Sequence, residues 1–157
     1  MKHRVLFTVA ATMAAVAAAM YIVLRRRRTD AESDTETPLP PVAGRVTQGF
    51  SSSHRGVDIA VAEGTEVLCP WDGTVQRVWY DDQYGGGRSL LVRHDNGLTT
   101  GYAHLSGYHF GSGDRVLRGQ SIALSGNSGS HTTGPHLHFT LRNKAGQKID
   151  PQSVFAF

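Results

Sequence analysis

Apolar and polar residues alternate with a period of two in several short stretches of residues 44–157, and no sustained helical period interrupts them. Alternation of this kind is typical of half-buried β-strands, whereas amphipathic helices repeat about every 3.6 residues. The chain also carries 18 glycines among 157 residues, which favours many turns between short strands. We therefore expect an all-β fold, an antiparallel β-sandwich or a barrel.

Turn residues separate the expected strands. These strands cover residues 45–50, 57–61, 73–80, 88–94, 98–104, 121–125 and 136–142. Asp95-Asn96-Gly97 separates the fourth strand from the fifth. An Asn-Gly pair between two apolar runs is a strong signal for a β-hairpin, so we expect these two strands to pair antiparallel.

An uncharged apolar run precedes this domain. Residues 5–24 carry no charge, and as a helix they would span about 30 Å, the thickness of a bilayer core. We expect a single transmembrane helix within residues 1–28, which would anchor the protein in the cell membrane. A signal peptide cleaved near Ala17-Ala18-Ala19 is one alternative, and a buried soluble helix is another.

Residues 29–43 are first acidic and then proline-rich, which indicates an extended linker before a folded domain at 44–157. From residue 41 onward the chain has ten basic and nine acidic residues, so its overall positive charge comes from the N-terminal segment. This balance does not support a nucleic-acid-binding surface. Cys69 is the only cysteine, which excludes an intrachain disulfide and a cysteine zinc cluster.

Histidine and aspartate fall on the polar faces of two expected strands. In residues 57–61 the odd-numbered apolar residues point into the core, so Asp58 points the other way, together with His54 if the strand extends back. His136 and His138 flank Leu137 and share one face of their strand. Taken from spacing alone, each pattern competes with a simple surface histidine or a cross-strand polar pair.

The remaining histidines are assigned less specific places. His3 belongs to the N-terminal segment, and His94 is expected at the surface beside the Asn-Gly turn. His109 and His131 lie in loops, where an ordinary loop role is favoured over a place in a cleft. His104 ends an expected strand and joins His54, Asp58, His136 and His138 as a candidate for one site.

A catalytic zinc site usually has three protein ligands and keeps one position open for water. Five candidates exceed that number, so some of them should act on the water or on the substrate. The chain has no H-E-x-x-H motif, and histidine must then serve as the general base. An unperturbed imidazole pKa of about 6.5 suits proton transfer near neutral pH.

Three segments in order, HRGVDIA from His54, GYAHLS from Gly101 and GPHLHF from Gly134, resemble the three motifs of the M23 zinc metallopeptidases. This family contains the lysostaphin- and LytM-type peptidoglycan endopeptidases, and the resemblance extends over about residues 42–151. It implies an antiparallel β fold with a groove across one sheet. It also implies hydrolysis of peptide bonds in peptidoglycan cross-links or stem peptides.

The resemblance assigns a role to each candidate. One zinc ion would be held by His54, Asp58 and His138, and a zinc-activated water would be served by the catalytic histidines His104 and His136. Some family members have lost metal ligands and activate other hydrolases. A non-catalytic peptidoglycan-binding or activating module is therefore the alternative, although all five residues are present here.

One departure from the family concerns a tyrosine. Staphylococcal members carry a tyrosine upstream of the first motif that reaches the site, and RVTQGFSSS at residues 45–53 contains none. Tyr102 is a candidate neighbour of the site, with core packing as an equal alternative. Cys69 is expected to be a small core residue.

A wall substrate implies that the domain faces the cell wall or the periplasm. Arg25–Arg28 follow the apolar run, and by the positive-inside rule they favour a cytoplasmic domain instead. A phage-type lysis enzyme held inside until the membrane is breached would satisfy both observations. Secretion after signal cleavage is the other alternative.

Overall fold

The computed structural model describes residues 37–81 and 83–157. The strands in this part of the chain are β1 (Arg45–Gln48), β2 (Val57–Ala60), β3 (Glu66–Leu68), β4 (Gly73–Asp81), β5 (Gly87–His94), β6 (Thr99–Leu105), β7 (Gly107–Tyr108), β8 (Arg115–Val116), β9 (Ser121–Leu124), β10 (His136–Arg142) and β11 (Lys148–Ile149). A 3-10 helix, η1 (Pro151–Ser153), follows them. The predicted all-β class is confirmed for the described residues.

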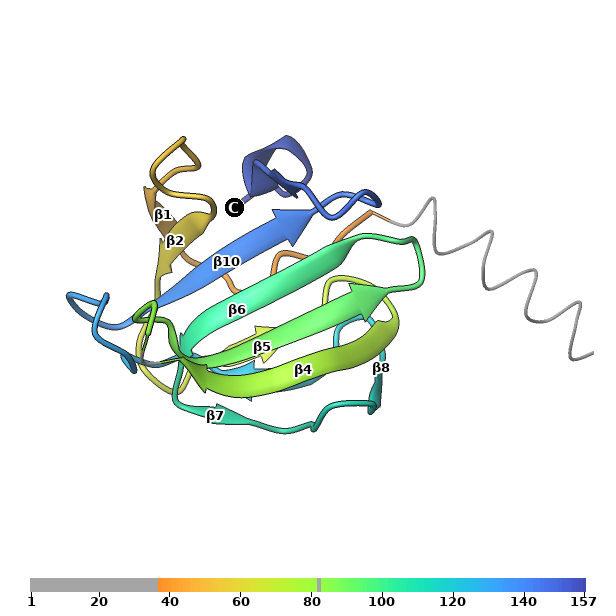
Figure 1. Cartoon of the computed structure of the whole chain (residues 1–157), viewed down its shortest axis with the longest axis horizontal. Helices are drawn as coiled ribbons and strands as arrows, with labels where there is room; N and C mark the ends of the chain where they lie inside the picture. The colour runs from red at the N-terminus through yellow and green to blue at the C-terminus, as the bar shows by residue number, and fades with distance from the viewer. Residues whose placement is uncertain (1–36, 82) are drawn as a thin grey trace, which may run out of the picture. The chain divides into compact units, whose positions relative to one another are not determined.

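Two antiparallel sheets make up the domain. The larger sheet has the order β1-β2-β10-β6-β5-β4-β8, and β11 pairs with β10. The smaller sheet has the order β3-β9-β7. Figure 1 shows β4, β5, β6 and β10 side by side across the middle of the domain, with β7 below β4. In this order β10, near the C-terminal end of the domain, lies between β2 and β6.

One hydrophobic core is shared by the two sheets. Ile59 and Leu137 from the larger sheet and Ile122 from the smaller sheet are fully buried in the same cluster. Burial of each such side chain stabilises the fold by about 1.5–3 kcal/mol. Asp58 and His138 alternate with these core residues and are only half-buried, so they lie on the opposite face of the larger sheet.

The strands that the alternation predicts correspond to β1, β2, β4, β5, β6, β9 and β10. The predicted hairpin joins β5 to β6, and its turn closes with a hydrogen bond of 3.0 Å from the Gly97 N–H to the His94 carbonyl. Gly97 has a φ of 85°, which glycine adopts without strain. The strands β3, β7, β8 and β11 were not predicted, because two or three residues are too few to show a period.

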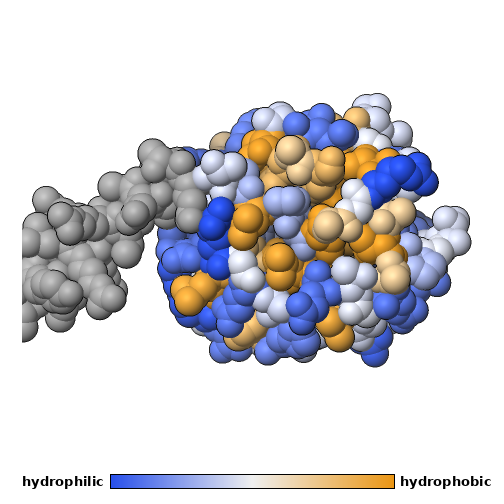
Figure 2. All heavy atoms as spheres, turned by 180° about the vertical axis from the view of Figure 1, so that it is seen from behind, coloured by the Kyte–Doolittle hydropathy of each residue, from blue (hydrophilic) through white to orange (hydrophobic). Residues whose placement is uncertain are grey.

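The side of the domain opposite to the view of Figure 1 carries apolar residues in patches between hydrophilic ones (Figure 2). Among the described residues, the large apolar side chains that are exposed are Tyr80, Tyr84, Leu117 and Val154. Most large apolar side chains of the described domain are therefore buried or partly buried.

The predicted membrane segment at residues 1–28 and most of the linker at 29–43 lie outside the described residues. In the described part of the chain, no helix combines the length and the hydrophobicity needed to span a membrane. The last residues of the predicted linker pack on the domain. Val42 is buried, and the Pro41 carbonyl accepts a hydrogen bond of 2.8 Å from the Leu68 N–H.

Candidate metal centre

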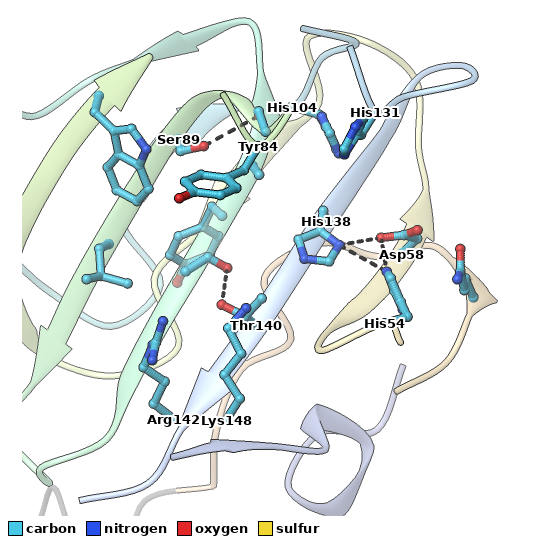
Figure 3. Close-up of a pocket in the computed structure, with 17 residues that line it drawn as sticks. His54, Asp58, Tyr84, Ser89, His104, His131, His138, Thr140, Arg142 and Lys148 are labelled. Atoms are coloured by element: carbon cyan, nitrogen blue, oxygen red, sulfur yellow. Dashed lines mark hydrogen bonds and ion pairs between the residues drawn. The ribbon is translucent and has the colours of Figure 1, made fainter. Parts of the chain in front are cut away.

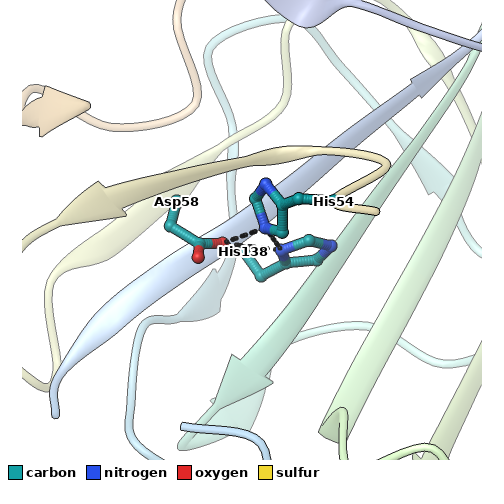
Figure 4. A group of neighbouring side chains, drawn as sticks. All are labelled: His54, Asp58 and His138. Atoms are coloured by element: carbon teal, nitrogen blue, oxygen red, sulfur yellow. Dashed lines mark hydrogen bonds and ion pairs between the residues drawn. The ribbon is translucent and has the colours of Figure 1, made fainter. Parts of the chain in front are cut away.

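Three side chains converge on the polar face of the larger sheet (Figure 4). His54 Nε2 lies 3.1 Å from Asp58 Oδ1 and 3.2 Å from His138 Nδ1. Asp58 Oδ1 and His138 Nδ1 are 2.6 Å apart. Within the described residues, these three form a group whose ligand atoms all lie within 4.8 Å of one another. Two imidazoles and one carboxylate in this arrangement can hold a metal ion.

The pairing of β2 with β10 positions two of the three. Asp58 and His138 are direct partners in this antiparallel ladder, so their side chains emerge side by side on one face. His54 precedes β2, and two hydrogen bonds to Ser51 fix its backbone. The His54 N–H donates to the Ser51 hydroxyl, and the His54 carbonyl accepts from the Ser51 N–H. Its imidazole Nδ1 donates a hydrogen bond of 2.9 Å to the Gly49 carbonyl, which directs Nε2 toward Asp58.

Gly56 provides the space for the imidazole of His138. A Cβ atom at this position would lie 2.8 Å from His138 Cε1 and 2.7 Å from the Phe139 carbonyl oxygen. Contacts this short would push the ring away from its partners. The glycine between His54 and Asp58 therefore allows the close approach of β10.

Two further histidines stand beside this group. The rings of His104 and His136 lie 4.6 Å apart, and the His104 ring lies 6.1 Å from that of His138. His136 Nε2 is 3.8 Å from Asp58 Oδ1. All five predicted site residues are thus brought together, and their division into metal ligands and catalytic groups stays a prediction.

His104 reaches the site through an unusual backbone conformation. Ala103 is the partner of His138 and Tyr102 the partner of Phe139, so alternation would point the next side chain, that of His104, into the core. His104 instead has a φ of 61°, the single positive value of a non-glycine residue among those described. A left-handed residue breaks the alternation and turns the imidazole back to the site. Strain of this kind costs about 1–3 kcal/mol and clusters at functional sites.

Backbone carbonyls fix the tautomers of both of these histidines. His104 Nδ1 lies 2.8 Å from the Ser128 carbonyl oxygen, and His136 Nδ1 lies 2.8 Å from that of Gly134. A carbonyl oxygen can only accept, so each Nδ1 carries the proton and donates it. The Nε2 atom of each neutral ring is then left as a base.

Burial and charge set the protonation of two groups. Burial by itself would raise the pKa of Asp58, but the hydrogen bond from His138 and the nearby histidine charges outweigh it and lower this pKa. The carboxyl group is therefore ionised and ready to bind a cation. Burial lowers the pKa of His104 below its ordinary value, which keeps the ring neutral near neutral pH.

A groove of about 370 Å³ runs from this group across the larger sheet (Figure 3). Its floor comes from β5, β6 and β10 and includes Ser89, Gly101 and Thr140. Tyr84 and His131 stand near His104 at one end, and Arg142 and Lys148 stand at the other. The candidate metal centre thus opens into a groove whose lining extends along β10 from His138 to Arg142.

Residues 52–151 match the sequence model of Peptidase family M23. The chain belongs to peptidase family M23. This M23 chain is 44% identical to an uncharacterized metalloprotease of Haemophilus influenzae over 115 residues, which are 73% of the chain and 22% of the relative. It is 41% identical to the peptidoglycan DD-endopeptidase ShyA of Vibrio cholerae over 103 residues, 66% of the chain and 22% of the relative.

Solved structures lead to the same family. The M23 chain superposes on a zinc containing peptidase from Vibrio cholerae with a TM-score of 0.66 and 30% identity, over 76% of this chain and 39% of that one. The fold and its likeness to metallopeptidases are therefore established. The chain spans 22% of the length of the two curated relatives named above.

The structure corrects two sequence expectations and decides two others. His131 was expected to have an ordinary loop role, but it lines the groove. His94 was expected at the surface, but it is only 2% exposed, because its side chain points between the sheets rather than out of the turn. Tyr102 is a core residue that packs on Phe139, as its pairing position dictates. Cys69 is fully buried, as predicted.

Several residues of the groove were missed by the sequence analysis. Trp79, Tyr84, Arg142 and Lys148 line it, and His131 does so from its loop. One signal was present for Arg142, which follows His138 and Thr140 at alternate positions of the same strand. The others come from segments that only the sheet order brings together.

Proposed function

We propose that this domain is a zinc metalloendopeptidase that hydrolyses peptide bonds in peptidoglycan cross-links or stem peptides. The observation that carries the proposal is the group of His54, Asp58 and His138 at a groove, with the bases of His104 and His136 beside it. Membership of the M23 family supports the peptidase chemistry. The name of the Vibrio relative, a peptidoglycan DD-endopeptidase, supports the substrate.

The donor set fits zinc. Zinc in catalytic sites takes three nitrogen or oxygen ligands at about 2.0–2.2 Å in a tetrahedron, which separates ligand atoms by about 3.3 Å. Two of the three separations here, 3.1 and 3.2 Å, are close to this value. The third, 2.6 Å between Asp58 and His138, is a hydrogen-bond distance and would have to lengthen around an ion. His54, Asp58 and His138 would hold the metal.

A zinc ion at this place supplies a Lewis acid that polarises a peptide carbonyl and lowers the pKa of water. The protein residues handle the protons. With Nδ1–H donated to a carbonyl, the Nε2 atom of His104 or of His136 can accept the proton of the attacking water. The same nitrogen can then return that proton to the departing amine. The second histidine can donate to the oxygen on which negative charge develops only in its protonated form, through Nε2–H, since its Nδ1–H is bound to a carbonyl.

A non-catalytic wall-binding module is the alternative function. It would need neither imidazoles whose Nδ1 is fixed by a backbone carbonyl nor a strained residue at position 104. The structure has both, and a positive φ at His104 costs stability without improving the packing of the sheet. The strain favours a catalytic role over simple binding.

The test combines metal analysis with digestion of purified peptidoglycan. His138→Ala is expected to lose both bound zinc and release of new amino termini. His136→Ala is expected to retain zinc and lose turnover. His109→Ala, at an exposed position outside the groove, is the matched control and should keep both. Equal activity of His138→Ala and the parent protein would refute the metal assignment.

We also propose that residues 1–28 hold the domain at the cell membrane, facing the cell wall or the periplasm. The support is the uncharged run at residues 5–24 and the linker composition that follows it. Reporter fusions after Phe157 test the orientation. Reporter activity in the cytoplasm would contradict export and favour an enzyme that is held inside until lysis.

A further inference from the structure

Positive charges gather at the end of the groove away from His104. Arg142 and Lys148 line the groove there and are both half-buried (Figure 3). Arg55 lies next to them, because its guanidinium donates a hydrogen bond of 3.4 Å to the Lys148 carbonyl. Among the described residues, none of these three cations forms an ion pair. The groove therefore ends in uncompensated positive charge.

The β-ladder positions this charge on the same face as the metal group. Arg142 follows His138 and Thr140 at alternate positions of β10, and Lys148 is its direct partner on β11. Four residues of a strand span about 13 Å, at roughly 3.3 Å per residue. An extended peptide lying along β10 would cover this distance with about four residues, or fewer where the long side chains of Arg142 and Lys148 reach back.

Arg142 and Lys148 place two positive charges opposite each other in the ladder. Like charges directly opposite each other in a ladder repel. The pKa of Lys148 lies below its ordinary value. Burial is the larger cause, and repulsion from the charges of Arg142 and Arg55 adds to it. Local features that cost stability without a structural gain are typical of functional sites. An anionic group bound between the two side chains would remove the repulsion.

The geometry of Arg142 suits a carboxylate. One guanidinium nitrogen, Nη1, donates a hydrogen bond of 3.1 Å to the Gly146 carbonyl, which fixes the side chain at the turn between β10 and β11. The remaining N–H groups stay available, and a planar guanidinium pairs with a carboxylate through two parallel hydrogen bonds. The Lys148 ammonium adds a second donor beside it.

We propose that Arg142 and Lys148 bind a free carboxylate of the peptide substrate and thereby set which bond reaches the metal centre. The proposal rests on the proposed function, since it names the part of the substrate that the groove selects. Free carboxylates are a regular feature of peptidoglycan stem peptides. Substrates in which the selected carboxylate is amidated would be poor ones.

Binding of peptides to metal-free full-length protein tests the proposal without turnover. The probes are two synthetic stem pentapeptides, one with free carboxylates and one in which they are carboxamides, and the readout is the change in backbone amide NMR shifts. The parent protein should bind the carboxylate form about tenfold more tightly. Arg142→Gln should abolish this preference, and Arg142→Lys should retain part of it. A preference that survives in Arg142→Gln and Lys148→Gln would overturn the proposal.

Cleavage of the same two peptides by the zinc-loaded protein separates this proposal from the proposed function. Arg142→Gln should lower kcat/KM for the carboxylate peptide about tenfold and leave that for the carboxamide within about twofold. Arg45→Gln removes one charge from β1, outside the groove lining, and is the matched control. Equal losses on both peptides would overturn carboxylate recognition. A parent protein that binds the carboxylate selectively but cleaves neither these peptides nor purified peptidoglycan would overturn the proposed function and support the binding site.

Discussion

The buried His94 predicts how the stability of the domain depends on pH. Its Nδ1 donates a hydrogen bond of 3.1 Å to the Trp71 carbonyl, so Nε2 must accept the bond of 2.7 Å from the Thr100 hydroxyl. The Thr100 oxygen then accepts from the hydroxyl of Tyr102 at 2.8 Å. This chain of bonds needs a neutral imidazole, because a protonated Nε2 cannot accept and the bonds of the Thr100 and Tyr102 hydroxyls would have to reverse their direction.

Burial lowers the pKa of His94 from 6.5 to about 4. Between these values the unfolded chain carries the proton and the folded domain does not, so acidification favours unfolding. The stability that the neutral ring contributes is present above pH 6.5 and is lost as the pH falls toward 4. Each pKa unit corresponds to about 1.4 kcal/mol, which gives a loss of about 3 kcal/mol. Small domains have only about 5–15 kcal/mol in total, so the loss is readily measured.

The contribution of the neutral His94 ring to the unfolding free energy can be measured by urea unfolding. His94→Gln and the parent protein are compared from pH 7 to pH 4 with a chelator present. The variant is less stable at pH 7, and the difference in unfolding free energy should shrink by about 3 kcal/mol at pH 4. Thr100→Val is the matched control, because it removes a bond of the same buried network but keeps the imidazole. Its stability should fall with pH as that of the parent does. A constant difference between His94→Gln and the parent across the range would refute the reasoning.

Three further predictions concern single positions. Gly56→Ala should weaken zinc binding about tenfold or more in chelator competition, because the new methyl group meets the His138 ring and the Phe139 carbonyl. His104→Gly and His104→Ala should both lose peptidase activity, but the glycine variant should be about 1 kcal/mol more stable to urea, since it relieves the positive φ; equal stability would contradict the strain. Burial raises the pKa of Cys69 to about 12, so a thiol reagent at pH 8 should label it only after unfolding, and rapid labelling of the folded protein would contradict this burial.

The strands of the larger sheet, and the face on which their side chains lie, were largely predictable, because apolar residues at every second position mark the buried face of a strand. The alternation around Asp58 and around His138 placed each side chain on the outer face of its strand, and the structure confirms both. Alternation does not say which strands are neighbours. The family resemblance predicted that Asp58 and His138 belong to one site. The pairing of β2 with β10, two segments about 80 residues apart, was not predicted and comes from the structure.

The remaining misses have local causes. A period-two pattern places Tyr102 and His104 on one face, and the left-handed backbone of His104 separates them, with Tyr102 in the core and His104 at the site. His94 was assigned to the surface from its polarity and its place beside a turn. The bonds to Trp71 and Thr100 that satisfy it after burial come from other segments.

The carbonyl groups that orient His54, His104 and His136 allow the sequence of the surrounding loops to change without loss of the site. All three anchors, at Gly49, Ser128 and Gly134, belong to the main chain of loops outside the named strands. Every amino acid has this acceptor, so substitutions that keep the path of these loops leave the imidazole tautomers intact. Loop side chains that face the groove can then be exchanged to change the preferred peptide, while the proton-transfer apparatus stays the same.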